Sequence, residues 1–199
     1  MASVVGYSQS VSDAFTDIQL IFLDRDGVVN RKPQEGNYVL TCEQFEFLPH
    51  APEAIARLNR AGIKVAVITN QRGVGLGKLS EADLRSIHNH MKRELQAYNA
   101  HIDGIFYCPH DGNSCECRKP KPGLLFRAFE HFRQVKPANA ILIGDSLPDI
   151  EAGQRAGVRT ILVRGPAATR KSGFAEAEKK ADAVASSLAD AVSRVLRIT

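Results

Sequence analysis

The segment IQLIFLDRDG, residues 18–27, starts with a short apolar run and ends in two carboxylates and a glycine. An apolar run of this length that ends at an acidic residue is typical of a strand buried in a parallel sheet. The carboxylates of Asp24 and Asp26 are costly to place there unless a positive charge lies between them. A divalent cation would satisfy both, and Mg²⁺ favours oxygen ligands. An acidic turn that only ends the strand is the alternative.

Strand-like and helix-like segments alternate along the rest of the chain. Further strands are expected over residues 64–68, 105–107, 140–143 and 160–163, and helices over 52–61, 80–98, 124–132, 148–156 and 187–196. The polar stretch 166–180 is interpreted as a loop or a lid-like helix. This alternation predicts a three-layer, Rossmann-like α/β fold, in which helices cover both faces of a parallel sheet. No large cap domain is expected.

Length and composition fit one domain of ordinary size. The 199 residues carry a formal net charge of +4 and no Trp, and the basic residues are scattered, which argues against a nucleic-acid partner. No apolar run is long enough to cross a bilayer and no signal peptide is recognised, so a cytoplasmic protein without a membrane partner is expected. We predict an N-terminal extension over residues 1–17, a single domain over 18–199, and a monomer.

Three further polar clusters lie next to predicted elements: two directly follow predicted strands, and one lies just before a predicted helix. They are Thr69-Asn70-Gln71, Arg118-Lys119 within a proline-rich turn, and Gly144-Asp145-Ser146. Ligands bind beyond the carboxyl ends of parallel strands, so these clusters are expected at one edge of the sheet. Each has a simpler interpretation when taken alone: an ordinary capping turn, a solvated basic loop, or a helix N-cap.

Three of the four cysteines lie within ten residues of one another. Cys108, His110, Cys115 and Cys117 match a Cys₃His zinc site, and four protein ligands leave no open position, so this zinc is expected to be structural. It would hold the chain in place just before Lys119. Reduced thiols beside a surface histidine are the alternative. Clustering of this kind in a chain without an export signal favours metal over disulfides.

Taken together and in this order, DxDG, Thr-Asn, Lys and GDxxxD resemble the haloacid dehalogenase superfamily of phosphohydrolases. The resemblance implies that Asp24 attacks phosphorus and forms an aspartyl-phosphate, and that Asp26 acts as general acid and then general base. It implies that Thr69 and Lys119 bind the transferring oxygens. Mg²⁺ would be held by Asp24, Asp145 and the backbone carbonyl of Asp26.

The resemblance extends over about residues 18–163 and implies minor roles for two further positions. Arg25 would only separate the two carboxylates of the first motif, with its side chain pointing elsewhere. Asp149 would brace the loop or a Mg²⁺-bound water.

The motifs DRDG, TNQ, CPH, CxCRKPxPG and GDxxxD are similar to the branch of histidinol phosphatases and heptose-bisphosphate phosphatases, and most similar to the latter. This implies removal of the 7-phosphate of D-glycero-D-manno-heptose 1,7-bisphosphate, with a small phosphorylated sugar as the partner. Because a cap is lacking, short loops would recognise it. The implied substrate contacts are Glu35, Gly36, Asn37, Tyr38, Asn70, Gln71, Arg72, Arg118 and Ser146.

The sequence also departs from this pattern. An arginine usual in the loop after TNQ is absent, and Arg72 is the candidate to replace it. Ser146 stands where a lysine is common, and the zinc loop is short, as in histidinol phosphatases. Histidinol phosphate or another small sugar phosphate therefore stays an alternative substrate. A nucleic-acid 3′-phosphatase and a non-catalytic binding module are further alternatives; the absence of a basic channel disfavours the first and the complete motif set the second.

Overall fold

In the computed structural model, which describes residues 17–33, 36–112, 115–165 and 172–196, six strands form one parallel sheet. The strands are β1 (Leu20–Leu23), β2 (Lys64–Asn70), β3 (Gly104–Cys108), β4 (Ala140–Gly144), β5 (Arg159–Val163) and β6 (Ala183–Ala185). Their order is β3-β2-β1-β4-β5-β6. The chain moves outward from β1 in one direction and then, from β4, in the other. The carboxyl ends of β1 and β4 therefore lie at a topological switch point, where such sheets bind ligands.

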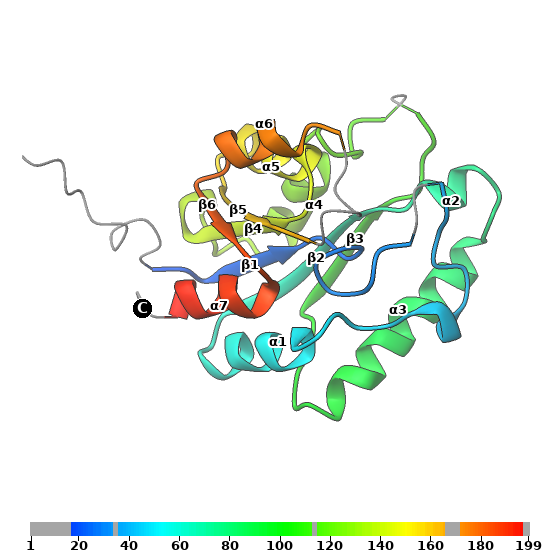
Figure 1. Cartoon of the computed structure of the whole chain (residues 1–199), viewed down its shortest axis with the longest axis horizontal. Coiled ribbons are helices and arrows are strands. Elements are labelled where there is room, and N and C mark those ends of the chain that lie inside the picture. Colours follow the sequence, from blue (N-terminus) through cyan, green and yellow to red (C-terminus); the bar gives the residue numbers. More distant parts are fainter. Residues whose placement is uncertain (1–16, 34–35, 113–114, 166–171, 197–199) are drawn as a thin grey trace, which may run out of the picture.

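Helices cover both faces of the sheet, as Figure 1 shows. The helices α1, α3 and α7 pack on one face and α4, α5 and α6 on the other, which confirms the predicted three-layer fold. Within the described ranges no segment forms a separate cap domain. The helices are α1 (Ala51–Arg60), α2 (Arg72–Gly75), α3 (Glu81–Gln96), α4 (Gly123–His131), α5 (Leu147–Arg155), α6 (Phe174–Lys180) and α7 (Leu188–Leu196), with 3₁₀ turns η2 (Cys42–Gln44) and η3 (Pro137–Asn139).

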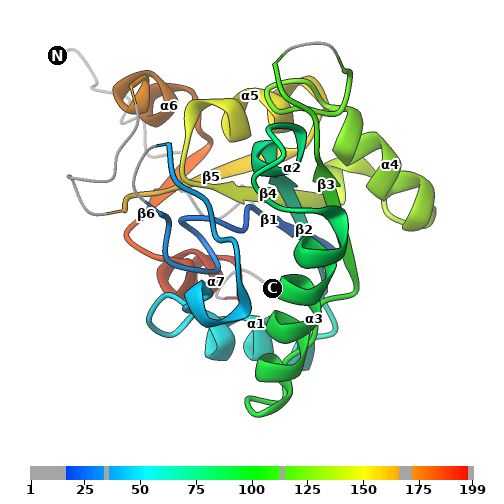
Figure 2. The same ribbon diagram turned by 90° about the vertical axis from the view of Figure 1, so that its right-hand side faces the viewer.

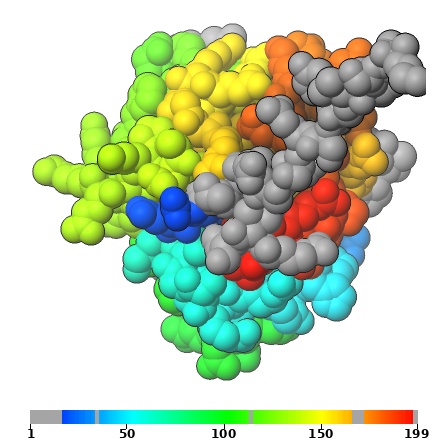
Figure 3. All heavy atoms as spheres, turned by 90° about the vertical axis from the view of Figure 1, so that its left-hand side faces the viewer, coloured from blue at the N-terminus to red at the C-terminus, as the bar shows by residue number. Residues whose placement is uncertain are grey.

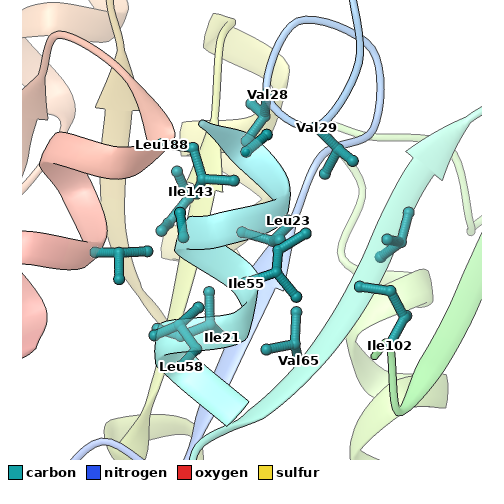
Figure 4. Close-up of a cluster of buried hydrophobic side chains, with 14 of the residues drawn as sticks. Ile21, Leu23, Val28, Val29, Ile55, Leu58, Val65, Ile102, Ile143 and Leu188 are labelled. Carbon is teal, nitrogen blue, oxygen red and sulfur yellow. The ribbon is translucent and has the colours of Figure 1, made fainter. Parts of the chain in front are cut away.

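The apolar run of β1 is buried because its side chains alternate between two cores. Ile21 and Leu23 face the core under α1, whereas Leu20 and Phe22 face the core under α4 and α5. Figure 4 shows side chains of α1, including Ile55, packed over Ile21 and Leu23. Because neither face of β1 is exposed to solvent, the strand is held firmly along its whole length. Asp24 follows directly after its last residue, Leu23.

Backbone hydrogen bonds join the amino ends of neighbouring strands. The backbone N–H of Gln19 donates to the carbonyl of Asn139 at 2.9 Å, and its own carbonyl accepts from the N–H of Lys64 at 2.9 Å. Figure 3 shows this face, with the start of the described chain between the cyan α1 region and the yellow-green segment that precedes β4. The polar clusters gather at the opposite edge, onto which Figure 2 looks, with α2 in front of the sheet.

The structure adds two elements that the sequence did not predict, β6 and α2. Both are short, and α2 is a single turn containing two glycines, so neither has a recognisable period. Helix α6 falls inside the stretch expected to be a loop or lid-like helix; residues 166–171 of that stretch lie outside the described residues. No helix in the described part of the chain is long and apolar enough to cross a membrane.

Candidate active site

Three carboxylates meet at the carboxyl edge of the sheet. Asp24 follows β1, Asp145 follows β4, and Asp149 lies in the first turn of α5. Carboxylate oxygens of all three lie within 4.8 Å of one another. The pKa of Asp24 is raised to about 7: burial raises it most, the charge of Lys119 opposes the rise, and the carboxylates of Asp149, Asp145 and Asp26 add to it. Three carboxylates this close together in a buried place are costly unless cations lie beside them.

The ammonium of Lys119 joins two of these carboxylates. It lies 2.9 Å from Asp24 Oδ1 and 2.5 Å from Asp149 Oδ1, and it donates to the carbonyl of Ile68 at 2.9 Å. Burial disfavours the charged form, but Asp149 and Asp24 outweigh it, so the pKa of Lys119 is raised. Lys119 thus stays cationic beside Asp24, where it can also attract phosphoryl oxygens.

The carboxylate of Asp26 is held by three side chains. Arg25 donates to it through Nε at 3.2 Å and through Nη2 at 3.0 Å to each oxygen, Asn30 donates at 3.0 Å, and Gln71 donates at 3.0 Å. Burial would raise the pKa of Asp26, but the Arg25 charge and the hydrogen bonds together lower it. The expectation that Arg25 points elsewhere is wrong, because its guanidinium folds back onto Asp26.

The polar residues at the end of β2 and directly after it form hydrogen bonds with other protein groups. Asn70 donates to the Lys119 carbonyl at 3.1 Å and accepts from its N–H at 3.0 Å, which ties β2 to the Lys119 turn. Gln71 also donates to Thr69 Oγ1 at 2.9 Å, and both are buried. Thr69 lies at the end of β2, as predicted. Asn70 thus holds Lys119 in place and Gln71 holds Asp26, and the contacts of both residues with substrate stay predictions.

Helix α5 begins with a capping box that the sequence predicted only as an N-cap. Ser146 donates from Oγ to Asp149 Oδ2 at 2.5 Å, and its backbone N–H donates to the same oxygen at 3.1 Å. Asp149 is completely buried and braces this loop, as expected for it. Ser146 is buried as well, so its implied contact with substrate remains a prediction.

The four predicted zinc ligands come together at the end of β3, which supplies Cys108, and in the loop that follows it. The Sγ of Cys108 lies 3.5 Å from that of Cys115 and 3.2 Å from that of Cys117, and His110 Nδ1 lies 3.3 Å from Cys117 Sγ. Burial, followed by the neighbouring thiols, raises the pKa of Cys117 to about 12, so the cluster tolerates a further thiolate poorly without a cation. This donor set fits tetrahedral zinc.

Glycines let the loop of the Cys₃His cluster pack tightly against its neighbours. A Cβ on Gly75 of α2 would lie 2.5 Å from the N atom of Asp111 and 2.7 Å from the carbonyl oxygen of Pro109. A Cβ on Gly123 would overlap the carbonyl oxygen of Glu116. Because the loop is wedged between α2 and α4, a fixed loop also fixes the position of Lys119.

The remaining predicted contacts lie on the loops beside this site. Arg72 Nε pairs with Asp111 Oδ1 at 2.5 Å, and the ring of Tyr38 packs beside Gly73. Arg118 Nη1 is buried and has no hydrogen-bond partner among the described residues. Gly36 and Asn37 are exposed, and Glu35 lies outside the described residues.

Sequence reasoning missed Lys32, whose ammonium pairs with Asp145 Oδ2. Its side chain is 13% exposed, so this cation lies inside the carboxylate cluster. Gly27 approaches the same oxygen with a φ of +98°, and a Cβ there would overlap it, so only glycine fits. Lys32 belongs to no motif, and only the folded loop brings it to Asp145.

Comparison with known proteins agrees with this arrangement. The sequence model of the HAD-hydrolase-like family matches residues 116–191. A D-glycero-beta-D-manno-heptose-1,7-bisphosphate 7-phosphatase of Salmonella typhi is 37% identical over 187 residues, which cover 89% of this chain and 95% of that protein. A D-glycero-alpha-D-manno-heptose-1,7-bisphosphate 7-phosphatase of Mycobacterium bovis is 42% identical over 132 residues, which cover 66% of this chain and 69% of that protein.

A solved structure is similar over nearly the whole chain. The D,D-heptose 1,7-bisphosphate phosphatase from B. bronchiseptica, complexed with magnesium and phosphate, superposes with a TM-score of 0.77 at 33% identity. The superposition covers 92% of this chain and 100% of the B. bronchiseptica chain. Because the fold, the order of the motifs and the identity over most of the chain agree, this chain belongs to the heptose-bisphosphate phosphatase family of haloacid dehalogenase-like hydrolases.

Proposed function

We propose that this protein is a Mg²⁺-dependent phosphomonoester hydrolase that removes the 7-phosphate of D-glycero-D-manno-heptose 1,7-bisphosphate. The observation that carries the chemistry is the buried set of Asp24, Lys119 and Asp145 at the carboxyl edge of the sheet. The names of relatives that share 37% and 33% identity with this chain over most of its length support the choice of substrate.

The site fits Mg²⁺ by its donors and by its charge. Asp24, Asp145 and the backbone carbonyl of Asp26 would hold the ion, and hard oxygens are the ligands that it prefers. Burial, and after it the neighbouring carboxylates, raise the pKa of Asp24, and a divalent cation would relieve the repulsion among these carboxylates. When bound, Mg²⁺ would polarise the phosphoryl group and reduce repulsion between two anions.

Asp24 performs the nucleophilic step. Its carboxylate forms a bond to phosphorus as the bond between phosphorus and the sugar oxygen breaks, which leaves an aspartyl-phosphate. Lys119, held by Asp149, remains beside Asp24 and attracts the equatorial oxygens. Thr69, at the end of β2, is the second proposed contact to those oxygens.

Asp26 moves the protons. In the first step it gives a proton to the departing sugar oxygen, and in the second it takes one from the water that attacks the aspartyl-phosphate. The hydrogen bonds from Arg25, Asn30 and Gln71 favour the ionised form that the second step needs. Its acid form requires the negative charge of an arriving phosphate, which raises the pKa of a nearby carboxyl group.

The zinc ligands and the nearby loops would prepare the site rather than react. Zinc held by Cys108, His110, Cys115 and Cys117 would fix the turn that carries Arg118 and Lys119. The unpartnered Nη1 of Arg118 is a donor suited to a second phosphate or to sugar hydroxyls. Arg72, the first residue of α2, is paired with Asp111 and completes the proposed recognition surface.

Phosphate release with Mg²⁺ tests the substrate. Both anomers of heptose 1,7-bisphosphate and histidinol phosphate are compared at equal low concentration, because relatives are named for either anomer. We expect kcat/KM to favour one bisphosphate anomer by about 100-fold, or about 2.7 kcal/mol in barrier. A preference for histidinol phosphate would overturn the proposed substrate but leave the proposed phosphatase mechanism in place. Absence of hydrolysis of every ester, or binding of labelled DNA at low salt, would favour the binding-module or nucleic-acid alternatives.

A further inference from the structure

His88 is the polar member of an otherwise apolar helix face. The other buried residues of α3 are Leu84, Ile87, Met91 and Leu95. His88 is 5% exposed, and an imidazole in such a place is costly unless it is hydrogen-bonded. The motifs of the sequence do not include it, and the proposed reaction does not use it.

The partner of His88 is Arg25. Its Nε2 lies 3.3 Å from Arg25 Nη1, and both side chains are buried. Burial, with the Arg25 charge second, lowers the pKa of His88 to about 3, so the ring is neutral. Guanidinium only donates, and the neutral ring therefore accepts at Nε2. The ring of Tyr107 lies 5.8 Å away, and the Tyr107 hydroxyl donates to Glu81 at 2.9 Å, which confines the imidazole from the side of β3.

Arg25 is held at both ends of its guanidinium plane. Nε and Nη2 donate to Asp26, and Nη1 faces His88. Arg25 is 1% exposed, so no solvent can replace a lost acceptor at Nη1. Without His88 this buried cation must turn or shift to find another acceptor, and the Asp26 carboxylate bound to its other end must shift with it.

We propose that His88 is a positioning residue for phosphoryl transfer, which acts by holding Arg25 and, through Arg25, the carboxylate of Asp26. This inference rests on the proposed function, because it concerns the proton transfers assigned to Asp26. His88 touches neither the substrate nor the reacting atoms; it sets the direction in which Asp26 presents its oxygens.

The dependence of the rate on the leaving group separates positioning from general damage. A sugar alkoxide needs a proton from Asp26 as it departs, whereas p-nitrophenolate departs without one. We therefore measure kcat/KM, which reports the first half-reaction, for heptose 1,7-bisphosphate and for p-nitrophenyl phosphate. The variants are His88→Leu, which removes the acceptor, and His88→Gln, which keeps an acceptor near Nε2. Met91→Ala is the matched control, because Met91 is a fully buried residue on the same helix face.

For His88→Leu, kcat/KM on the sugar phosphate should fall by about tenfold or more, with at most a small loss on p-nitrophenyl phosphate. His88→Gln should restore most of the loss, and Met91→Ala should affect both substrates alike. Equal losses on both substrates in His88→Leu would overturn the proposal. If His88→Leu does not fold, His88→Asn, whose amide is too short to reach Arg25, replaces it with the same expected pattern. Wild-type protein that hydrolyses neither ester would instead overturn the proposed function, and the role of His88 with it.

Discussion

The ammonium of Lys119 lies 2.9 Å from the Asp24 carboxylate, and a second contact of 2.5 Å joins it to Asp149. The two aspartates belong to different motifs, after β1 and at the start of α5, and Lys119 comes from the loop after β3. One cation therefore ties three segments together beneath the proposed phosphoryl site. It neutralises the nucleophile and holds it in place at the same time.

Removal of this cation should destabilise the fold as well as stop the reaction. Lys119→Met leaves two buried carboxylates facing each other, and breaking a buried pair costs about 3–5 kcal/mol. The double variant Asp24→Asn/Lys119→Met should recover part of this loss, because one of the uncompensated charges is gone. Urea unfolding of the wild type, both single variants and the double variant measures the coupling. If the single-variant effects simply add, Lys119 and Asp24 are not coupled as the structure indicates.

Mg²⁺ binding should depend on pH because Asp24 must be ionised to hold the ion. In the metal-free protein the pKa of Asp24 is raised from 3.8 to about 7, so the proton on this carboxyl favours the folded state. Its contribution is complete below pH 3.8 and is lost as pH rises through about 7. Mg²⁺ should therefore bind more tightly and raise the Tm more at pH 8 than at pH 6.

Calorimetric titration of the metal-free protein with Mg²⁺ at both pH values checks this expectation. Asp24→Asn is the control, since it removes the titrating group and should weaken binding while flattening the dependence on pH. An Mg²⁺ affinity that is equal at pH 6 and pH 8 in the wild type would show that Asp24 does not compete with the proton for the ion.

Lys32 should compete with Mg²⁺ for Asp145. Its ammonium pairs with the Oδ2 oxygen of that carboxylate, so binding of the ion requires this side chain to move away. Lys32→Met should lower the apparent Kd for Mg²⁺ by roughly tenfold. Arg31→Met is a matched control, because it removes the same charge from the neighbouring residue, which pairs with the exposed Glu46. Equal effects of the two variants on Mg²⁺ affinity would show that Lys32 acts only through its positive charge, and not by pairing with Asp145.

Cys115→Ser should remove zinc and destabilise the loop that carries Lys119. We expect the purified variant to hold less than one zinc per chain and to unfold at a lower temperature, with the phosphatase chemistry affected only through the loop. Cys42→Ser is the control, since Cys42 lies outside the cluster. This variant should hold as much zinc as the wild type. Elemental analysis and thermal unfolding measure both properties. Wild-type protein that contains no zinc yet has normal stability would refute the structural metal.

The sequence was sufficient to predict the strands that carry the site. Buried parallel strands are short apolar runs, and their carboxyl ends meet at one edge, so Asp24, Thr69 and Asp145 could be placed together without coordinates. The Cys₃His cluster could be predicted equally well, because its four residues lie within ten residues of one another, at the end of β3 and in the loop after it. Strand β6 was missed because three residues carry no detectable alternation.

The contacts that orient the site could not be predicted. Arg25 was expected to point away, yet its guanidinium binds Asp26 and lies against His88 of a distant helix. Asn70 holds the backbone of Lys119, a role that no motif of the sequence indicates. Pairings between residues far apart in the chain leave no periodic signal in a single sequence, and only the packed structure reveals them.

The most direct test of the account is the release of phosphate from heptose 1,7-bisphosphate by wild-type protein and by Asp24→Asn, followed by ³¹P NMR of the product. Wild type with Mg²⁺ should release one phosphate per molecule and leave the 1-phosphate in place, and the folded Asp24→Asn variant should release none. Turnover by Asp24→Asn at the wild-type rate, or a wild-type product that retains the 7-phosphate, would contradict it.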